Sequence, residues 1–198
     1  LVFDSQWWLQ NNSKYDDDFD CDFDELETEE DYRREILISI RDALERNKHK
    51  QIIFASHHPL YSSGRYGGHF PAEENLFPLL AINKYLWVPL PGFLYTGARK
   101  FMGMPQDLSH PEYKEFRRSL TTLFKNYDNI TYISAHDYNL QYAFREGLHH
   151  IVSGGATTGD YSARNNKIGF AYSSIGVGRL SFFNNGDVVL EFIKPKED

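Results

Sequence analysis

The sequence predicts an α/β fold that finishes in antiparallel strands. Two observations support this: short apolar runs alternate with segments of helical periodicity, and the last two apolar runs are joined by an Asn-Gly turn. The 198 residues are enough for one domain with a buried core. A composition of 41% hydrophobic and 16% aromatic residues is typical of a folded protein rather than a disordered one.

Two segments have the periodicity of amphipathic helices. In residues 32–47, apolar side chains recur at Ile36, Ile40 and Leu44, so they share one face. In residues 111–126, a proline stands at an early position, where a helix tolerates it best. The inner face of this second helix would carry Phe116, Leu120, Leu123 and Phe124.

Six apolar runs predict strands, and a glycine-containing loop at residues 63–69 follows the second of them. The last two runs are separated by residues 184–187, which read Asn-Asn-Gly-Asp and favour a hairpin turn. The predicted strands are at residues 1–9, 51–56, 130–135, 149–153, 170–183 and 188–193.

An acidic loop is expected at residues 11–31. Residues 16–31 hold eleven of the 28 acidic side chains and no Lys or Arg, so the net charge of −7 is concentrated there. We interpret it as a solvated loop that leads into a helix N-terminus. A calcium-binding loop is the alternative, but an EF-hand needs a glycine that this stretch lacks. The chain has no basic stripe, so nucleic acid is not an expected partner, and the single Cys21 excludes an internal disulfide.

An apolar insertion spans about residues 70–110, and its most apolar part is 76–104. Its prolines and Lys84 argue against a continuous membrane-spanning helix. One interpretation is an ordered insertion that packs over an active-site face. The other is an exposed apolar patch that contacts a membrane surface or a protein partner.

Two segments carry the clearest functional signal. Residues 54–64 (Phe-Ala-Ser-His-His-Pro-Leu-Tyr-Ser-Ser-Gly) and residues 133–141 (Ile-Ser-Ala-His-Asp-Tyr-Asn-Leu-Gln) each have an apolar run that ends in a histidine. In an open α/β sheet such residues lie at the carboxyl edge, where ligands bind. Two neutral imidazoles at this edge would form half of a metal site.

These two segments resemble the last two motifs of the calcineurin-like metallophosphoesterases, in the branch that contains the purple acid phosphatases. Residues 1–9 and 151–156 are similar to further strands of that family. The resemblance implies the C-terminal portion of a β-sandwich flanked by helices. The family's first-half motifs, Asp-x-His, Gly-Asp-x-x-Asp and Asn-His-Glu/Asp, do not occur. We therefore expect a piece of a longer protein, with the missing N-terminal half of the domain as its partner.

The resemblance further implies a dinuclear centre of Fe, Zn or Mn, in which a metal-bound hydroxide hydrolyses a phosphate ester. His57 and His136 would bind one of the two metals. Tyr138 stands where the family has a histidine for the other metal. A tyrosine phenolate can bind ferric iron, but it must first lose its proton, so we expect that this ligand is lost.

Three residues near the first motif are the catalytic candidates that the resemblance implies. Tyr66 stands where the family usually has a histidine that faces the substrate. Arg65 could bind a phosphate oxygen, and His69 could replace the missing histidine.

The other polar residues near the motifs are expected to be structural. His58 should pack or support the site. One of His149 and His150 should face the core and bond to the backbone. Asn139 and Gln141 should hold their loop.

The favoured function is therefore part of a metal-dependent phosphoesterase that acts on phosphate esters, with this chain alone inactive. The alternative is a non-catalytic descendant of the same fold, used for binding or membrane association. An uncovered sheet edge would also pair readily with a second copy, which predicts a homodimer.

Overall fold

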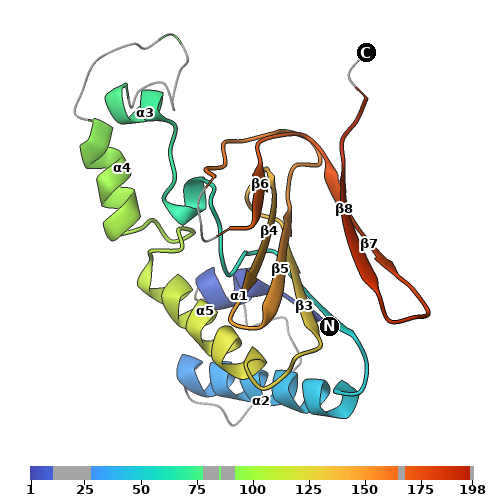
Figure 1. Ribbon diagram of the computed structural model, residues 1–198. Helices are drawn as coiled ribbons and strands as arrows, with labels where there is room; N and C mark the ends of the chain where they lie inside the picture. Colours follow the sequence, from blue (N-terminus) through green and yellow to red (C-terminus); the bar gives the residue numbers. More distant parts are fainter. Residues whose placement is uncertain (11–27, 78–84, 86–91, 165–167, 197–198) are drawn as a thin grey trace.

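The computed structural model describes residues 1–10, 28–77, 85, 92–164 and 168–196 and has an α/β architecture (Figure 1). Helices flank one mixed sheet, and the chain ends in an antiparallel strand pair. The predicted fold class is thereby confirmed. Most of the acidic loop, with Cys21 and the alternating aspartates, and most of residues 78–91 lie outside the described residues.

The main sheet has six strands in the order β1-β2-β3-β5-β4-β6. Strands β1, β2, β3 and β5 are parallel, whereas β4 lies antiparallel between β5 and β6. The strands are β1 (Val2–Phe3), β2 (Ile52–Ser56), β3 (Ile130–Ser134), β4 (Leu140–Arg145), β5 (Leu148–Ser153) and β6 (Phe170–Tyr172).

Three helices, α1 (Ser5–Gln10), α2 (Glu29–Asn47) and α5 (Pro111–Phe124), pack around an aromatic core on one face of the sheet (Figure 1). The side chain of Thr28 caps α2, because its Oγ1 accepts a hydrogen bond from the Asp31 amide at 3.2 Å. The core includes Trp8, Leu44, Phe54, Phe116, Leu120, Phe124 and Tyr132. Both predicted helices are therefore confirmed.

Arg33 ties these three helices together. Its guanidinium group forms ion pairs with Glu29 of α2 and with Glu112 and Glu115 of α5. It also donates to the Trp8 carbonyl of α1 at 3.3 Å and lies over the Trp8 ring. The Arg33 side chain is only 11% exposed, so its charge needs these partners.

Two further helices, α3 (Ala72–Leu76) and α4 (Gly92–Phe101), stand to one side of the sheet (Figure 1). They border the central part of the predicted apolar insertion. Among the helices that the structure describes, none combines the length and the apolar composition needed to cross a bilayer.

A separate hairpin, β7 (Val177–Phe182) and β8 (Val188–Ile193), lies beside the main sheet. The Gly178 amide of β7 donates to Ser153 Oγ of β5 at 2.8 Å. A cavity of about 760 Å³ separates the hairpin from the sheet, and its wall includes Tyr142, Ile151, Phe170, Leu190 and Phe192. The hairpin exposes apolar side chains, among them Phe182 and Val189. Pairing with a second copy or with the rest of the domain stays a prediction.

The structure corrects three local predictions. Residues 1–9 are not one strand: Asp4 Oδ1 accepts from the Gln6 amide at 2.9 Å, and the chain turns into α1 after β1. The predicted strand at 170–183 is interrupted, because Gly176 passes close to Ile193 and Leu140 as the chain moves from one sheet to the other. Strand β4 was not predicted, because its second residue, Gln141, was interpreted as part of a loop.

A three-histidine candidate metal site

The two histidine-bearing loops leave adjacent parallel strands at the same edge of the sheet. Strand β2 pairs with β3 through Ala55 and Ile133, and both strands end in these loops. The Ala135 amide then donates to the His57 carbonyl oxygen at 3.1 Å, which joins the two loops directly. The predicted convergence at a carboxyl edge follows from this parallel pairing.

His57, His58 and His136 form one cluster at this edge. Their potential ligand nitrogens all lie within 4.8 Å of one another. His57 Nε2 and His136 Nδ1 are 3.1 Å apart, and the His58 and His136 ring centroids are 4.3 Å apart. Since Zn–N bonds are about 2.1 Å long, small side-chain rotations would bring three nitrogens to one cation. Within the described part of the chain, this is the one such group of three ligands.

The electrostatics favour neutral imidazoles at His58 and His136. Burial, with a smaller contribution from the neighbouring histidines, lowers the pKa of His58 to about 3. Burial and the proximity of His57 lower the pKa of His136 to about 4. The Nε2 atoms of His58 and His136 are buried and have no hydrogen-bond partner among the described residues. Neutral imidazoles with buried, unpaired nitrogens fit a transition-metal cation.

Ser5 holds His58 from the start of α1. Its Oγ lies 2.8 Å from His58 Nδ1 and accepts from the His58 amide at 3.1 Å. If Nδ1–H donates to Ser5, the lone pair of the ring falls on Nε2, which has no other partner among the described residues. The sequence did not reveal this role, because Ser5 is 53 residues away and its segment was predicted as a strand.

Three buried side chains fix the loop that follows β2. Tyr132 donates to the His58 carbonyl at 2.7 Å, and Tyr113 donates to the Pro59 carbonyl at 2.7 Å. The Leu60 amide donates to His150 Nε2 at 3.1 Å. The prediction that one of His149 and His150 faces the core and bonds to the backbone is confirmed. Burial lowers the pKa of His150 to about 3.

The loop that follows β3 turns sharply at His136. The Asp137 amide donates to the Ala135 carbonyl at 2.7 Å across His136, whose φ is 60°. This three-residue turn is rare and strained for a residue other than glycine. Gly154 packs directly against the Asp137 carbonyl and leaves no space for a Cβ. The turn directs the His136 ring into the cluster.

A polar network links the two loops beneath the histidines. Gln141 Oε1 accepts from the Ser63 amide at 2.8 Å and from Ser63 Oγ at 3.0 Å, and Gln141 Nε2 donates to Asn139 Oδ1 at 2.7 Å. Ser62 Oγ donates to the Asp137 carboxylate. Burial raises the pKa of Asp137 to about 6, although the Ser62 hydrogen bond acts in the opposite direction. As predicted, Asn139 and Gln141 hold the loop.

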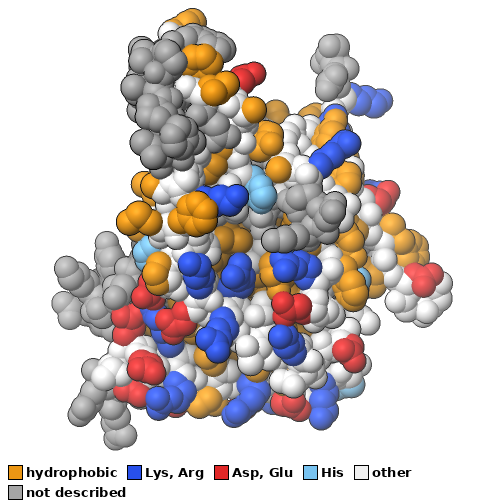
Figure 2. Space-filling view, turned by 60° about the vertical axis from the view of Figure 1, so that its left-hand side comes forward, with side chains coloured by type: hydrophobic (Ala, Val, Ile, Leu, Met, Phe, Trp, Pro, Cys, Tyr) orange, Lys and Arg blue, Asp and Glu red, His pale blue; other side chains and the backbone are white. Residues whose placement is uncertain are grey.

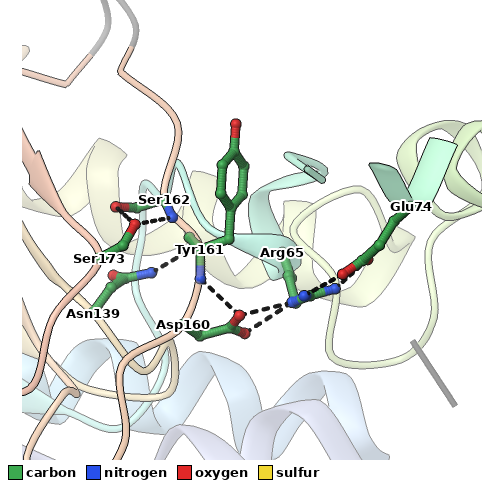
Figure 3. Close-up of polar contacts among 7 residues, drawn as sticks. All are labelled: Arg65, Glu74, Asn139, Asp160, Tyr161, Ser162 and Ser173. Carbon is green, nitrogen blue, oxygen red and sulfur yellow. Dashed lines mark hydrogen bonds and ion pairs between the residues drawn. The ribbon is translucent and has the colours of Figure 1, made fainter. Parts of the chain in front are cut away.

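Of the residues predicted to face the substrate, Tyr66 lies beside the histidine cluster, whereas Arg65 is held by two carboxylates. The Tyr66 ring contacts His136, with ring centroids 4.0 Å apart, and burial raises the pKa of its phenol. Arg65 lies between Glu74 and Asp160, as Figure 3 shows, with its Nε 2.9 Å from the Asp160 oxygens. The hydrogen bond to Glu74 is the largest cause of a raised pKa for Arg65.

His69 and Tyr138 are not part of the three-histidine cluster. His69 lines a separate cavity of about 330 Å³ together with Phe70, Lys100 and Tyr161. Tyr138 is 49% exposed, although it is only two residues from His136. The described residues therefore bring together His57, His136 and Tyr66 as predicted and add His58 to them.

The sequence matches no family model and no curated protein. The fold is similar to a solved structure of GAP50, described as the anchor in the inner membrane complex of Plasmodium, with a TM-score of 0.56 and 20% sequence identity. The match covers 98% of this chain but 44% of that one, so this chain spans less than half of its length. At this identity the similarity establishes a shared fold and nothing further.

Proposed function

We propose that this chain belongs to a metallophosphoesterase-like domain that holds one transition-metal cation through His57, His58 and His136. We further propose that the protein uses this domain for binding or anchoring rather than for efficient hydrolysis. The observation that carries the proposal is the contrast between three clustered histidines and an arginine, Arg65, that is already neutralised by two carboxylates.

Metal binding is supported by the donor set. Imidazole nitrogens suit Zn and Fe, and a bound cation would act as a Lewis acid toward an oxygen ligand. His57, His58 and His136 would be its ligands, and Ser5 would orient His58. The buried Nε2 atom of His58 would then gain the partner that it lacks among the described residues.

Three features argue against efficient phosphate-ester hydrolysis. Arg65 would have to leave Glu74 and Asp160 before it could bind a phosphate. Tyr138 is 49% exposed, and its phenol would have to lose its proton before it could bind a metal. Tyr66, whose pKa is raised by burial, is a poorer proton donor at neutral pH than an imidazole. The fold of an inner-membrane-complex anchor is compatible with a non-catalytic role.

Hydrolysis is the second candidate, and the intact histidine cluster favours it. In that case the remaining metal ligands would come from the first-half motifs that the resemblance implies. Arg65 would then leave Glu74 and Asp160 and bind the phosphate group once the substrate is bound.

One experiment separates the two candidates. The full protein is loaded with Zn, Mn or Fe, its metal content is measured, and its hydrolysis of p-nitrophenyl phosphate is assayed. We expect one equivalent of metal that His57→Ala/His136→Ala loses and that His149→Ala, an exposed control, retains. We expect no turnover above that of the double variant. Metal-dependent turnover that the double variant loses would establish the hydrolase instead, and the absence of bound metal would refute both candidates.

A further inference from the structure

Exposed apolar side chains cluster at the C-terminal end of α4. Phe101 is 78% exposed, Met102 75% and Met104 52%. Side chains of this size are rarely left so exposed in consecutive positions without a partner surface. The segment therefore presents an apolar tip, which we define as Phe101, Met102 and Met104.

The apolar tip is held rigidly against the start of α5. Ser109 Oγ donates to the Arg99 carbonyl at 2.7 Å, and the Met104 amide donates to Asp107 Oδ2 at 2.9 Å. Arg99 forms an ion pair with the same Asp107 carboxylate. A Cβ on Gly103 would lie 2.5 Å from the His110 amide nitrogen, so the turn and the helix are in direct contact. These contacts hold the backbone of the apolar tip in place, so its side chains are exposed on an ordered segment.

One face of α5 is basic. Lys114, Arg117 and Arg118 are spaced at i, i+3 and i+4, so they lie on one side of the helix. Among the described residues, none of the three has a carboxylate partner, since Glu112 and Glu115 pair with Arg33. On the face brought forward in Figure 2, Lys and Arg side chains gather next to exposed hydrophobic ones.

We propose that the apolar tip and the basic face of α5 together form a contact surface for an anionic lipid bilayer. Large apolar side chains beside cations are the pattern by which proteins bind a membrane interface: the apolar groups enter the headgroup region and the cations attract anionic lipids. Lys114, Arg117 and Arg118, which lack carboxylate partners in the part of the chain that the structure describes, are the observation that favours an anionic bilayer over a neutral one. The surface does not include the histidine cluster, so the proposal is independent of metal binding.

The test is cosedimentation of the full protein with vesicles of phosphatidylcholine alone and of phosphatidylcholine with 30% phosphatidylserine. We expect binding to the anionic vesicles that falls as salt is raised. Arg117→Gln/Arg118→Gln should weaken it by about fivefold per cation removed. Phe101→Ser/Met102→Ser should weaken it by about tenfold.

Matched controls keep the proposal falsifiable. Arg34→Gln/Arg41→Gln removes the same charge from α2, and Phe182→Ser removes an exposed phenylalanine from the hairpin. Both should bind like wild type, as should His57→Ala/His136→Ala. Circular dichroism checks that each variant is folded. Equal binding to both kinds of vesicle, binding that the two test variants retain, or no binding at all would each overturn the proposal.

Discussion

Ser5 Oγ lies 2.8 Å from His58 Nδ1, so the first helix of the described chain positions a residue of the candidate metal site. The same hydroxyl accepts from the His58 amide, which fixes the backbone of His58 as well as its ring. Both atoms are buried, so water is a poor substitute for either bond. This contact makes the proposed metal affinity dependent on a residue that cannot itself be a ligand in the cluster.

Ser5→Ala should weaken metal binding without removing a ligand. Partners that orient a metal-bound histidine typically contribute about 10- to 100-fold in affinity. Zinc affinity of the full protein, measured by competition with a chelating dye, should fall by about that factor. Ser162→Ala removes another buried hydroxyl, one that bonds to Ser173, and should leave the affinity unchanged. Unchanged affinity in Ser5→Ala would mean that the His58 ring is not oriented by Ser5.

Stability should depend on pH through His150. Its folded-state pKa is lowered to about 3, whereas an unfolded histidine titrates near 6.5. Between these values the unfolded state binds more protons, so the free energy of unfolding decreases as the pH falls. The loss from this residue is at most about 1.4 kcal/mol per pH unit. His150→Gln does not titrate and can still accept from the Leu60 amide.

Urea denaturation at pH 7, 6 and 5 tests this prediction. The difference in unfolding free energy between wild type and His150→Gln should shrink as the pH falls, because only wild type carries the buried imidazole. His149→Gln alters the exposed neighbour on the opposite face of β5 and should follow wild type. If the unfolding free energies of wild type and His150→Gln change with pH by the same amount, protonation of His150 is not linked to unfolding.

The turn at His136 predicts an unusual order of stabilities. At a φ of 60°, glycine is less strained than alanine, so His136→Gly should be more stable than His136→Ala by about 1 kcal/mol. Both variants remove the imidazole, so their difference reports on the backbone alone. At His57, which does not have a positive φ, the alanine variant should be the more stable of the corresponding pair. Chemical denaturation of the metal-free variants measures both differences, and the same order at the two positions would contradict the prediction.

Gly64 has no space for a side chain. A Cβ there would approach the Asp137 carboxyl carbon to 2.7 Å and Asn139 Nδ2 to 2.9 Å, within the network that links the two loops. We expect Gly64→Ala to destabilise the protein by about 1–3 kcal/mol, as overpacking does. Gly97→Ala in α4 is the control, because its Cβ would meet nothing within 4 Å. If thermal unfolding shows equal stabilities for the two variants, the network accommodates the methyl group.

The sequence was informative where a local pattern decides the structure. The periodicity of Ile36, Ile40 and Leu44 predicted α2, and the two histidine loops were correctly expected at one sheet edge. The roles of Ser5 and His58 could not be predicted, because their contact depends on long-range packing that no local pattern records. His69 shows the converse: a residue close to a motif in sequence can lie outside the site, since it lines a separate cavity.

The position of Arg33 has a consequence for local unfolding of the three helices that it joins. A single guanidinium group binds acceptors on α1, α2 and α5. Separation of α2 from α5 would therefore leave charges without compensation, and separation of α1 would leave the Trp8 carbonyl oxygen without this donor. The three helices should therefore behave as one cooperative unit in native-state hydrogen exchange, with similar opening free energies for their amides. An Arg33→Met variant should divide this unit, so that the short α1 exchanges ahead of the other two.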